Sequence, residues 1–288
     1  MKVYGFSFIR NAIRFQYPIK EALSSILPLC DEVIVAVGNS EDGTHDLVAS
    51  IDPKIKILDT VWDDHLREEG RVLAVETDKA FQAIPSDADW CFYIQGDEVL
   101  HEDGYEEIRL AMNRWKNDGN VDGLLFKYRH FYGSYDYTGS SSKWYRNEIR
   151  IIKNDKSIYA YRDAQGFRKG NNKKLNVKPL NAFIHHYGWV REPSAMHAKS
   201  MDFGRHWAGE NWDEKKVYTG EYDYSKIDSL QKFTGSHPEV MKNRIEAINW
   251  KFERDPSQNN LSLKEKAKNL VERWTGKRPF DYKNYNIV

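Results

Sequence analysis

Short apolar runs alternate with helical patterns along about the first hundred residues of the chain. Mainly apolar runs occupy residues 3–9, 33–37, 55–58 and 90–94; the run at 33–37 is continuous and rich in β-branched side chains. Such runs are typical of strands that are buried on both faces of a sheet. Apolar residues at helical spacing predict helices at 18–27, from about 45, and at 69–83. The alternation predicts an α/β fold with a mostly parallel sheet flanked by helices.

The character of the chain changes after about residue 190. Charge becomes dense there, and helical patterns occur at 195–207, 238–251 and 263–274. We therefore expect a domain at 1–190 that contains the sheet and a helical C-terminal extension at 191–288. The extension would pack on the first domain, cover an acceptor or form a homodimer.

Charge and cysteine content narrow the class of protein. The 43 basic and 43 acidic residues cancel, so no overall field attracts nucleic acid or an anionic membrane. Cys30 and Cys91 both lie in apolar segments, which favours reduced core thiols over a disulfide. No run reaches the roughly 18 apolar residues that span a bilayer, and no secretory signal is visible at the N-terminus. We expect a soluble, cytoplasmic protein without a transmembrane segment, for which peripheral membrane contact stays open.

Two adjacent carboxylates follow the fourth apolar run. Residues 90–94 end in Gln95-Gly96-Asp97-Glu98. Ligands of open α/β sheets bind outside the carboxyl ends of the strands, and carboxylates there suit Mg²⁺ shared with substrate phosphates. An equally open interpretation is a strand that stops in a polar turn.

Five segments follow one another in an order that resembles a known family. They are Phe8-Ile9-Arg10-Asn11, Leu23-Ser24-Ser25-Ile26-Leu27, and residues 31–35, 40–44 and 95–98. Together they resemble the family 2 glycosyltransferases with the GT-A (Rossmann-like) fold, over about residues 1–110 and more loosely over 145–190. The resemblance implies an enzyme of polysaccharide biosynthesis that moves a sugar from a UDP- or GDP-linked donor to a hydroxyl of a glycan or lipid-linked glycan. Inversion and a Mn²⁺ or Mg²⁺ cofactor are implied with it.

The resemblance also assigns metal ligands. Asp97 matches the metal-binding second acid of the family's Asp-x-Asp motif, and Gln95 replaces the first acid. His186 matches a late histidine that returns to the metal. Because a strand alternates faces, only one of His185 and His186 can point into the crevice, and we choose His186.

The catalytic base is expected near the end of the first domain. Asp163 lies about where relatives present the acid that deprotonates the acceptor hydroxyl, within hydrogen-bond reach of it. Gln165 is as close to that place but cannot take a proton. Glu98 is the alternative base or an acceptor contact, and an ordinary surface acid is an equal alternative for it.

Three residues are implied to contact the nucleotide, besides Gln95. Asn39 follows the place, at Val37 or Gly38, where many relatives carry an acid that contacts the base or ribose. It could also be only a turn former. Asp64 is expected near the base. Arg71 is expected near the phosphates, with a solvated helical ion pair as the alternative.

Aromatic side chains form a conspicuous loop, and two other functional classes stay open. Residues 130–137 are aromatic and polar, which suits a wall that faces a sugar or, equally, a packed hairpin. A nucleotidyltransferase would need a glycine-rich basic loop, and residues 8–14 contain no glycine. A non-catalytic carbohydrate-binding protein on a decayed transferase fold is favoured by Gln95 and by the missing acid near Val37.

Overall fold

Four parallel strands form the first half of the sheet, as the sequence predicts. The structure is a computed structural model that describes residues 1–63, 65–66, 70–207, 220–275, 278–279 and 282–288. The strands lie in the order β3-β2-β1-β4. They are β1 (Val3–Ile9), β2 (Glu32–Gly38), β3 (Ile55–Thr60) and β4 (Trp90–Tyr93), connected through helices α1 (Ile19–Ile26), α2 (Thr44–Ala49) and α3 (Arg71–Gln82).

The second half of the sheet is mixed, so the prediction of a mostly parallel sheet holds only for the first four strands. β8 (Asn147–Lys153) is antiparallel to β4 and to β6 (Gly123–Tyr132). β11 (Lys173–Trp189) is parallel to β6. The carboxyl ends of β1, β4, β6 and β11 therefore meet at one edge. The remaining strands of this region are β5 (Glu98–Leu100), β7 (Ser134–Gly139), β9 (Ile158–Tyr161) and β10 (Gly166–Lys169).

Each face of the sheet has its own hydrophobic core because the strands alternate. In β1, Val3 and Ile9 pack on the face that α1 and helix α4 (Tyr105–Trp115) cover. Tyr4 and Phe6 pack on the opposite face with α3. Cys30 and Cys91 are free and buried, one in each core, which confirms the expected core thiols.

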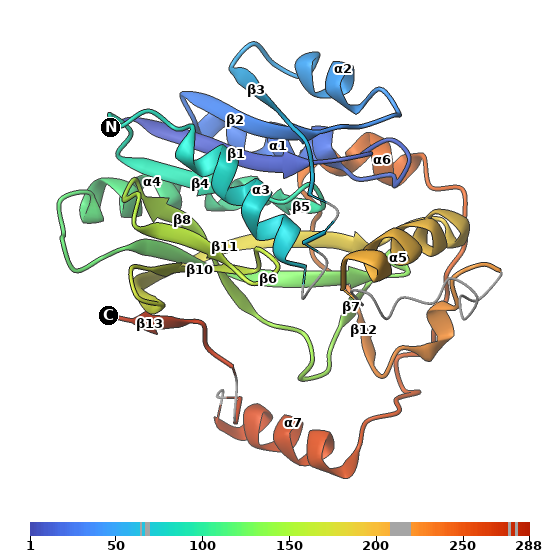
Figure 1. The fold of residues 1–288 in the computed structure, drawn as a ribbon. Coiled ribbons are helices and arrows are strands. Elements are labelled where there is room, and N and C mark those ends of the chain that lie inside the picture. Colours follow the sequence, from blue (N-terminus) through green and yellow to red (C-terminus); the bar gives the residue numbers. More distant parts are fainter. Residues whose placement is uncertain (64, 67–69, 208–219, 276–277, 280–281) are drawn as a thin grey trace.

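The C-terminal part contributes short strands besides the expected helices. β12 (Leu230–Lys232) pairs with β7, and β13 (Tyr285–Ile287) pairs with β11. The helix predicted at 238–251 is only a single 3₁₀ turn followed by α6 (Lys242–Glu246). Helix α7 (Leu263–Thr275) lies away from the sheet, whereas α5 (Pro193–Trp207) crosses beside the strand ends (Figure 1).

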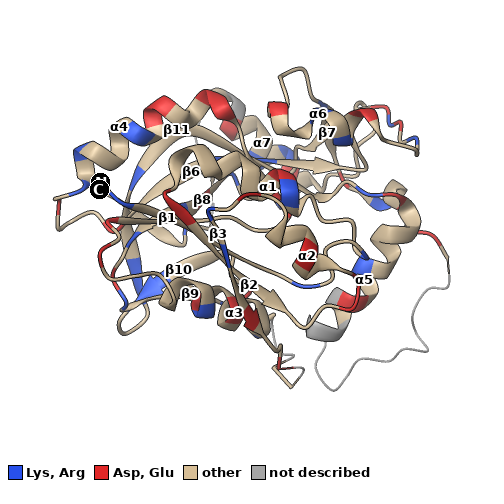
Figure 2. Cartoon of the chain, turned by 90° about the horizontal axis from the view of Figure 1, so that it is seen from above, with Lys and Arg blue, Asp and Glu red and all other residues tan. Residues whose placement is uncertain are grey.

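Surface charge follows the balanced composition. Acidic and basic positions are interspersed over the ribbon in Figure 2. None of the helices among the described residues combines the length and the apolarity needed to cross a bilayer.

Candidate active site

The candidate site lies where the strand order reverses. The chain runs from β1 through β2 to β3 on one side, and then returns to add β4 on the other side of β1. Ligands of open α/β sheets bind at such a switch point, outside the carboxyl ends of the strands. Arg10 follows β1 there, and Gln95, Gly96 and Asp97 follow β4.

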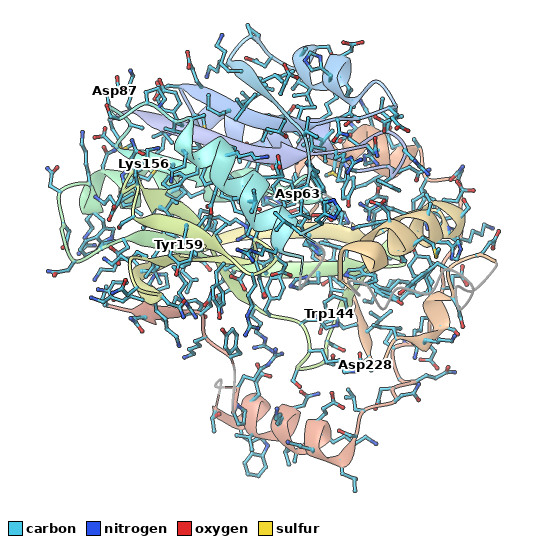
Figure 3. All side chains as sticks on the ribbon, in the orientation of Figure 1. Asp63, Asp87, Trp144, Lys156, Tyr159 and Asp228 are labelled. Atoms are coloured by element: carbon cyan, nitrogen blue, oxygen red, sulfur yellow. The ribbon has the colours of Figure 1, made fainter. Side chains whose placement is uncertain are left out.

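A cavity of about 520 Å³ opens at this point, within the usual size range of small-molecule sites. Its lining comes from several distant segments of the chain. The lining includes Arg10, Tyr17, Trp62, Gln95, Asp97, His130, Trp144, Tyr145, Asp163, Gln165, His186, Gly188, Trp189 and Lys199. Trp144 sits on the loop that descends from the sheet toward α7 (Figure 3).

Asp97 is the centre of a charged cluster. Its Oδ2 lies 3.0 Å from Lys199 Nζ and 4.0 Å from Arg191 Nη2. Its Oδ1 lies 3.7 Å from His186 Nε2. Burial alone would raise the pKa of Asp97, but Lys199, His186 and Arg191 hold it well below its usual range. Asp97 is therefore ionised at neutral pH.

Positive charge exceeds negative charge around Asp97. Burial and the neighbouring Arg191 lower the pKa of the Lys199 ammonium to about 8. Lys199 thus stays mostly charged at pH 7, and Arg191 is charged throughout. Burial lowers the pKa of His186, so that imidazole is mainly neutral. Two cations consequently face one carboxylate.

The structure places His186 in the cavity and His185 in the core, as strand alternation requires. His185 is fully buried and bonds to Arg129 and Tyr187. His130 Nε2 lies 2.8 Å from the carbonyl oxygen of Tyr145, which can only accept, so this nitrogen carries a hydrogen.

That hydrogen bond fixes the tautomer of the next histidine. Burial lowers the pKa of His130 well below its usual range, so His130 is neutral and its Nδ1 can only accept. His186 Nδ1, 3.2 Å away, is then the donor. The lone pair of neutral His186 lies on Nε2, the nitrogen that faces Asp97.

These residues do not fit a resident Mn²⁺ or Mg²⁺. Asp97 Oδ1 and His186 Nε2 are the two candidate donor atoms, and the part of the chain that the structure describes has no group of three His, Cys, Asp or Glu side chains placed to hold a metal. A divalent ion would also add two positive charges beside Lys199 and Arg191, the two cations that already face Asp97.

Gln95 supports the turn that carries Asp163. Its Nε2 donates to the carbonyl oxygen of Ala164 at 3.2 Å and to Tyr93 Oη at 3.1 Å. Arg162 and Ala164 flank Asp163 with φ angles of 56° and 62°, which side-chain-bearing residues rarely adopt. Such conformations concentrate at functional sites. Burial raises the pKa of Asp163, which lines the cavity.

The other predicted site residues lie elsewhere. Glu98 is fully buried, and both of its oxygens accept from Arg150, at 2.7 and 2.8 Å. Asn39 accepts a hydrogen bond from the Trp62 backbone at 3.4 Å. Arg71 is exposed at the start of α3. Among the described residues, the lining of the cavity includes none of these three. Asp64 lies outside the described residues.

The aromatic loop is mainly a packed hairpin. Phe131, Tyr132 and Tyr135 are buried, and of residues 130–137 the described lining includes His130. The aromatic wall of the cavity comes instead from the half-buried Trp144 and Trp189. Sequence reasoning assigned no role to either tryptophan.

Sequence reasoning also missed Arg10, Lys199 and Arg191. Arg10 lies directly after β1, and its guanidinium is 5.6 Å from the Trp62 ring centroid. Lys199 is one of three Lys, Arg or Asp residues on the helix predicted at 195–207. Nothing local indicates that this helix returns to the strand ends.

Comparisons with known proteins leave the family open. No protein-family model matches the chain, and no curated protein matches it. The chain is similar to the crystal structure of S. aureus TarS, with 14% identity over 75% of this chain and a TM-score of 0.42. It spans 41% of the length of that TarS chain.

Other solved structures are similar at the same low level. TarS 1–349 in complex with UDP-GlcNAc is 14% identical over 75% of this chain and 69% of that chain, with a TM-score of 0.42. Glucosyl-3-phosphoglycerate synthase from Mycobacterium tuberculosis, in complex with Mn²⁺, UDP and phosphoglyceric acid, is 15% identical over 45% of this chain and 43% of that chain, with a TM-score of 0.30. Values this low assign neither a family nor an activity.

Proposed function

We propose that the chain is a glycosyltransferase of GT-A type that moves a sugar from a nucleotide diphosphate donor to a hydroxyl acceptor with inversion. The observation that carries the proposal is one cavity, at the switch point of the sheet, that contains both a cationic centre and a carboxylate base. Lys199 beside Asp97 and His186 forms the centre, and Asp163 supplies the base. A diphosphate leaving group needs the cationic centre, and a hydroxyl nucleophile needs the base.

Asp163 is suited to accept the proton of the acceptor. Its pKa is raised by burial, which makes the carboxylate a stronger base than an exposed aspartate. The turn that carries it is tied to the end of β4 through Gln95. A direct displacement needs one base and one group that stabilises the leaving group. Such a displacement inverts the anomeric centre.

The aromatic wall suits the remaining parts of the donor and acceptor. Trp62 and Trp189 line the cavity with Trp144, and flat rings can stack on a nucleotide base or on the apolar face of a pyranose. The proposed acceptor is a hydroxyl of a glycan or lipid-linked glycan. In the proposed division of the chain, residues 1–190 supply Asp97 and Asp163, and residues 191–288 supply Lys199.

The resemblance implies Mn²⁺ or Mg²⁺ at Asp97 and His186. The two donor atoms of Asp97 and His186 lie beside the cations Lys199 and Arg191 and do not fit a resident metal ion. The proposed mechanism therefore includes no step at a metal.

A nucleotide panel tests the proposal. Thermal unfolding is measured with UDP, GDP, their sugar conjugates and nucleoside triphosphates, each at the same concentration. We expect the Tm to rise with a nucleoside diphosphate and its sugar conjugate, because a ligand that binds only the folded state stabilises it. A rise with triphosphates alone would favour a nucleotidyltransferase, and no rise with any nucleotide would contradict a donor site.

A further inference from the structure

Lys199 is anchored in the cavity by Asp97, which the resemblance assigns to a metal, and by Gly188. Its Nζ donates to Asp97 Oδ2 and to the carbonyl oxygen of Gly188, each at 3.0 Å. The ammonium also lies 4.9 Å from the ring centroid of Tyr17. Because Lys199 lines the cavity, the same ammonium can contact a bound anion.

Arg191 adds a second cation with an unused donor. The side chain is 1% exposed, and its Nε donates to the carbonyl oxygen of Phe15 at 2.7 Å. Nη2 has no hydrogen-bond partner among the described residues and lies 4.0 Å from Asp97 Oδ2. The described residues that line the cavity do not include Arg191, so its charge, and not a direct hydrogen bond, acts on a bound anion.

The charges balance without a metal ion. In the Asp-x-Asp motif of the family, two carboxylates would neutralise one divalent ion. Here Gln95 is neutral, so a single carboxylate remains at Asp97, and the single charge of Lys199 neutralises it. Arg191 then leaves a net positive charge for an anionic ligand. A divalent ion would instead add two further positive charges beside the two cations that already face Asp97.

We propose, on the basis of the function proposed above, that Lys199, assisted by Arg191, stabilises the departing nucleoside diphosphate in place of a divalent metal ion. In the transfer step, the acceptor oxygen bonds to the anomeric carbon while the bond from that carbon to the β-phosphate oxygen breaks. The electron pair of the broken bond stays on the phosphate oxygen, and the acceptor proton moves to Asp163. The Lys199 ammonium donates to the diphosphate, whose negative charge grows by one unit. Asp97 orients the ammonium.

Nucleotide binding with and without metal tests this role. Isothermal titration with UDP and with GDP is performed on the full chain, in EDTA and in Mn²⁺. We expect the wild type to bind one diphosphate equally in both. Lys199→Met should raise the Kd about 10- to 100-fold in EDTA and in Mn²⁺, because the loss of a hydrogen bond to a charged group has an effect of that size. Lys199→Arg should retain most of the affinity.

A matched control removes a lysine outside the cavity. Lys226 is exposed and pairs with Asp223, so Lys226→Met should leave the Kd unchanged. If Lys199→Met does not fold, the double variant Asp97→Asn with Lys199→Gln removes both charges of the pair together and should show the same loss of affinity.

Two results would overturn the inference in different ways. In the first, the wild type binds diphosphate only in Mn²⁺, and Lys199→Met binds it equally well in Mn²⁺. That result would remove Lys199 from the mechanism and leave the proposed transferase intact. Absence of diphosphate binding by the wild type in EDTA and in Mn²⁺ would overturn the proposed function and this inference with it.

Discussion

Lys199 Nζ lies 3.0 Å from Asp97 Oδ2, across a separation of 102 residues. The carboxylate comes from the end of β4, and the ammonium comes from α5. Their contact brings the C-terminal part of the chain onto the carboxyl edge of the sheet. The cavity is therefore assembled from both parts of the chain, and its charge depends on both.

Gln95 is expected to act on catalysis rather than on nucleotide binding. Gln95→Ala removes the donor to the Ala164 carbonyl and to Tyr93 Oη, so the turn that holds Asp163 loses its tie to β4. We expect kcat to fall by up to about tenfold, the equivalent of one lost hydrogen bond, with little change in diphosphate Kd. The exposed Gln231→Ala serves as the control. A large rise in Kd with an unchanged kcat would show instead that Gln95 binds the nucleotide.

Glu98 is expected to stabilise the fold. Glu98→Gln leaves the fully buried Arg150 guanidinium without its carboxylate, and removing one partner of a buried ion pair typically costs about 3–5 kcal/mol. Urea unfolding at pH 7 measures the loss in free energy of unfolding. Glu246→Gln, on the exposed side of α6, should change this free energy little. A variant at Glu98 that keeps full stability but loses transfer would make Glu98 the base in place of Asp163.

The buried Glu148 predicts a pH dependence of stability. Burial raises the pKa of Glu148 to about 8 from an ordinary value of 4.5, against the opposing effects of Arg150 and Gln165. The folded state therefore holds this proton more tightly than the unfolded state. The stability that the protonated carboxyl contributes is full below about pH 4.5 and is lost as the pH rises through about 8.

Glu148→Gln should remove that part of the pH dependence. The variant mimics the protonated carboxyl, so its free energy of unfolding should match the wild type at pH 4 and exceed it at pH 9. Urea unfolding at both pH values provides the comparison. A difference between the two proteins that does not vary with pH would show that folding does not raise the pKa of Glu148.

The parallel half of the fold could be predicted because its information is local. Runs such as Val3–Ile9 specify buried strands by themselves, and strand alternation predicts that His186 rather than His185 faces the cavity. The order of β8, β6 and β11 could not be predicted, since strand pairing over long separations leaves no periodicity in the sequence.

The charged cluster could not be predicted for the same reason. Lys199 reaches the site because α5 docks beside the strand ends, where the Tyr224 hydroxyl bonds to the Arg191 carbonyl and Met196 packs with Tyr132. Likewise, nothing near Glu98 in the sequence indicates that Arg150 will neutralise it. Local patterns identified Asp97 as a strand-end acid, but only the packing shows what surrounds it.

Release of nucleoside diphosphate from a sugar nucleotide tests the central claim most directly. The wild type and Asp163→Asn are compared with UDP- and GDP-sugars and a mixture of hydroxyl-bearing glycans. We expect the wild type to release diphosphate with transfer of the sugar. Asp163→Asn should lower kcat about 10²–10⁴-fold, because it removes the base, while the diphosphate Kd stays within a few-fold. A wild type that turns over none of these donors, or a stable Asp163→Asn protein with full transfer activity, would contradict the account.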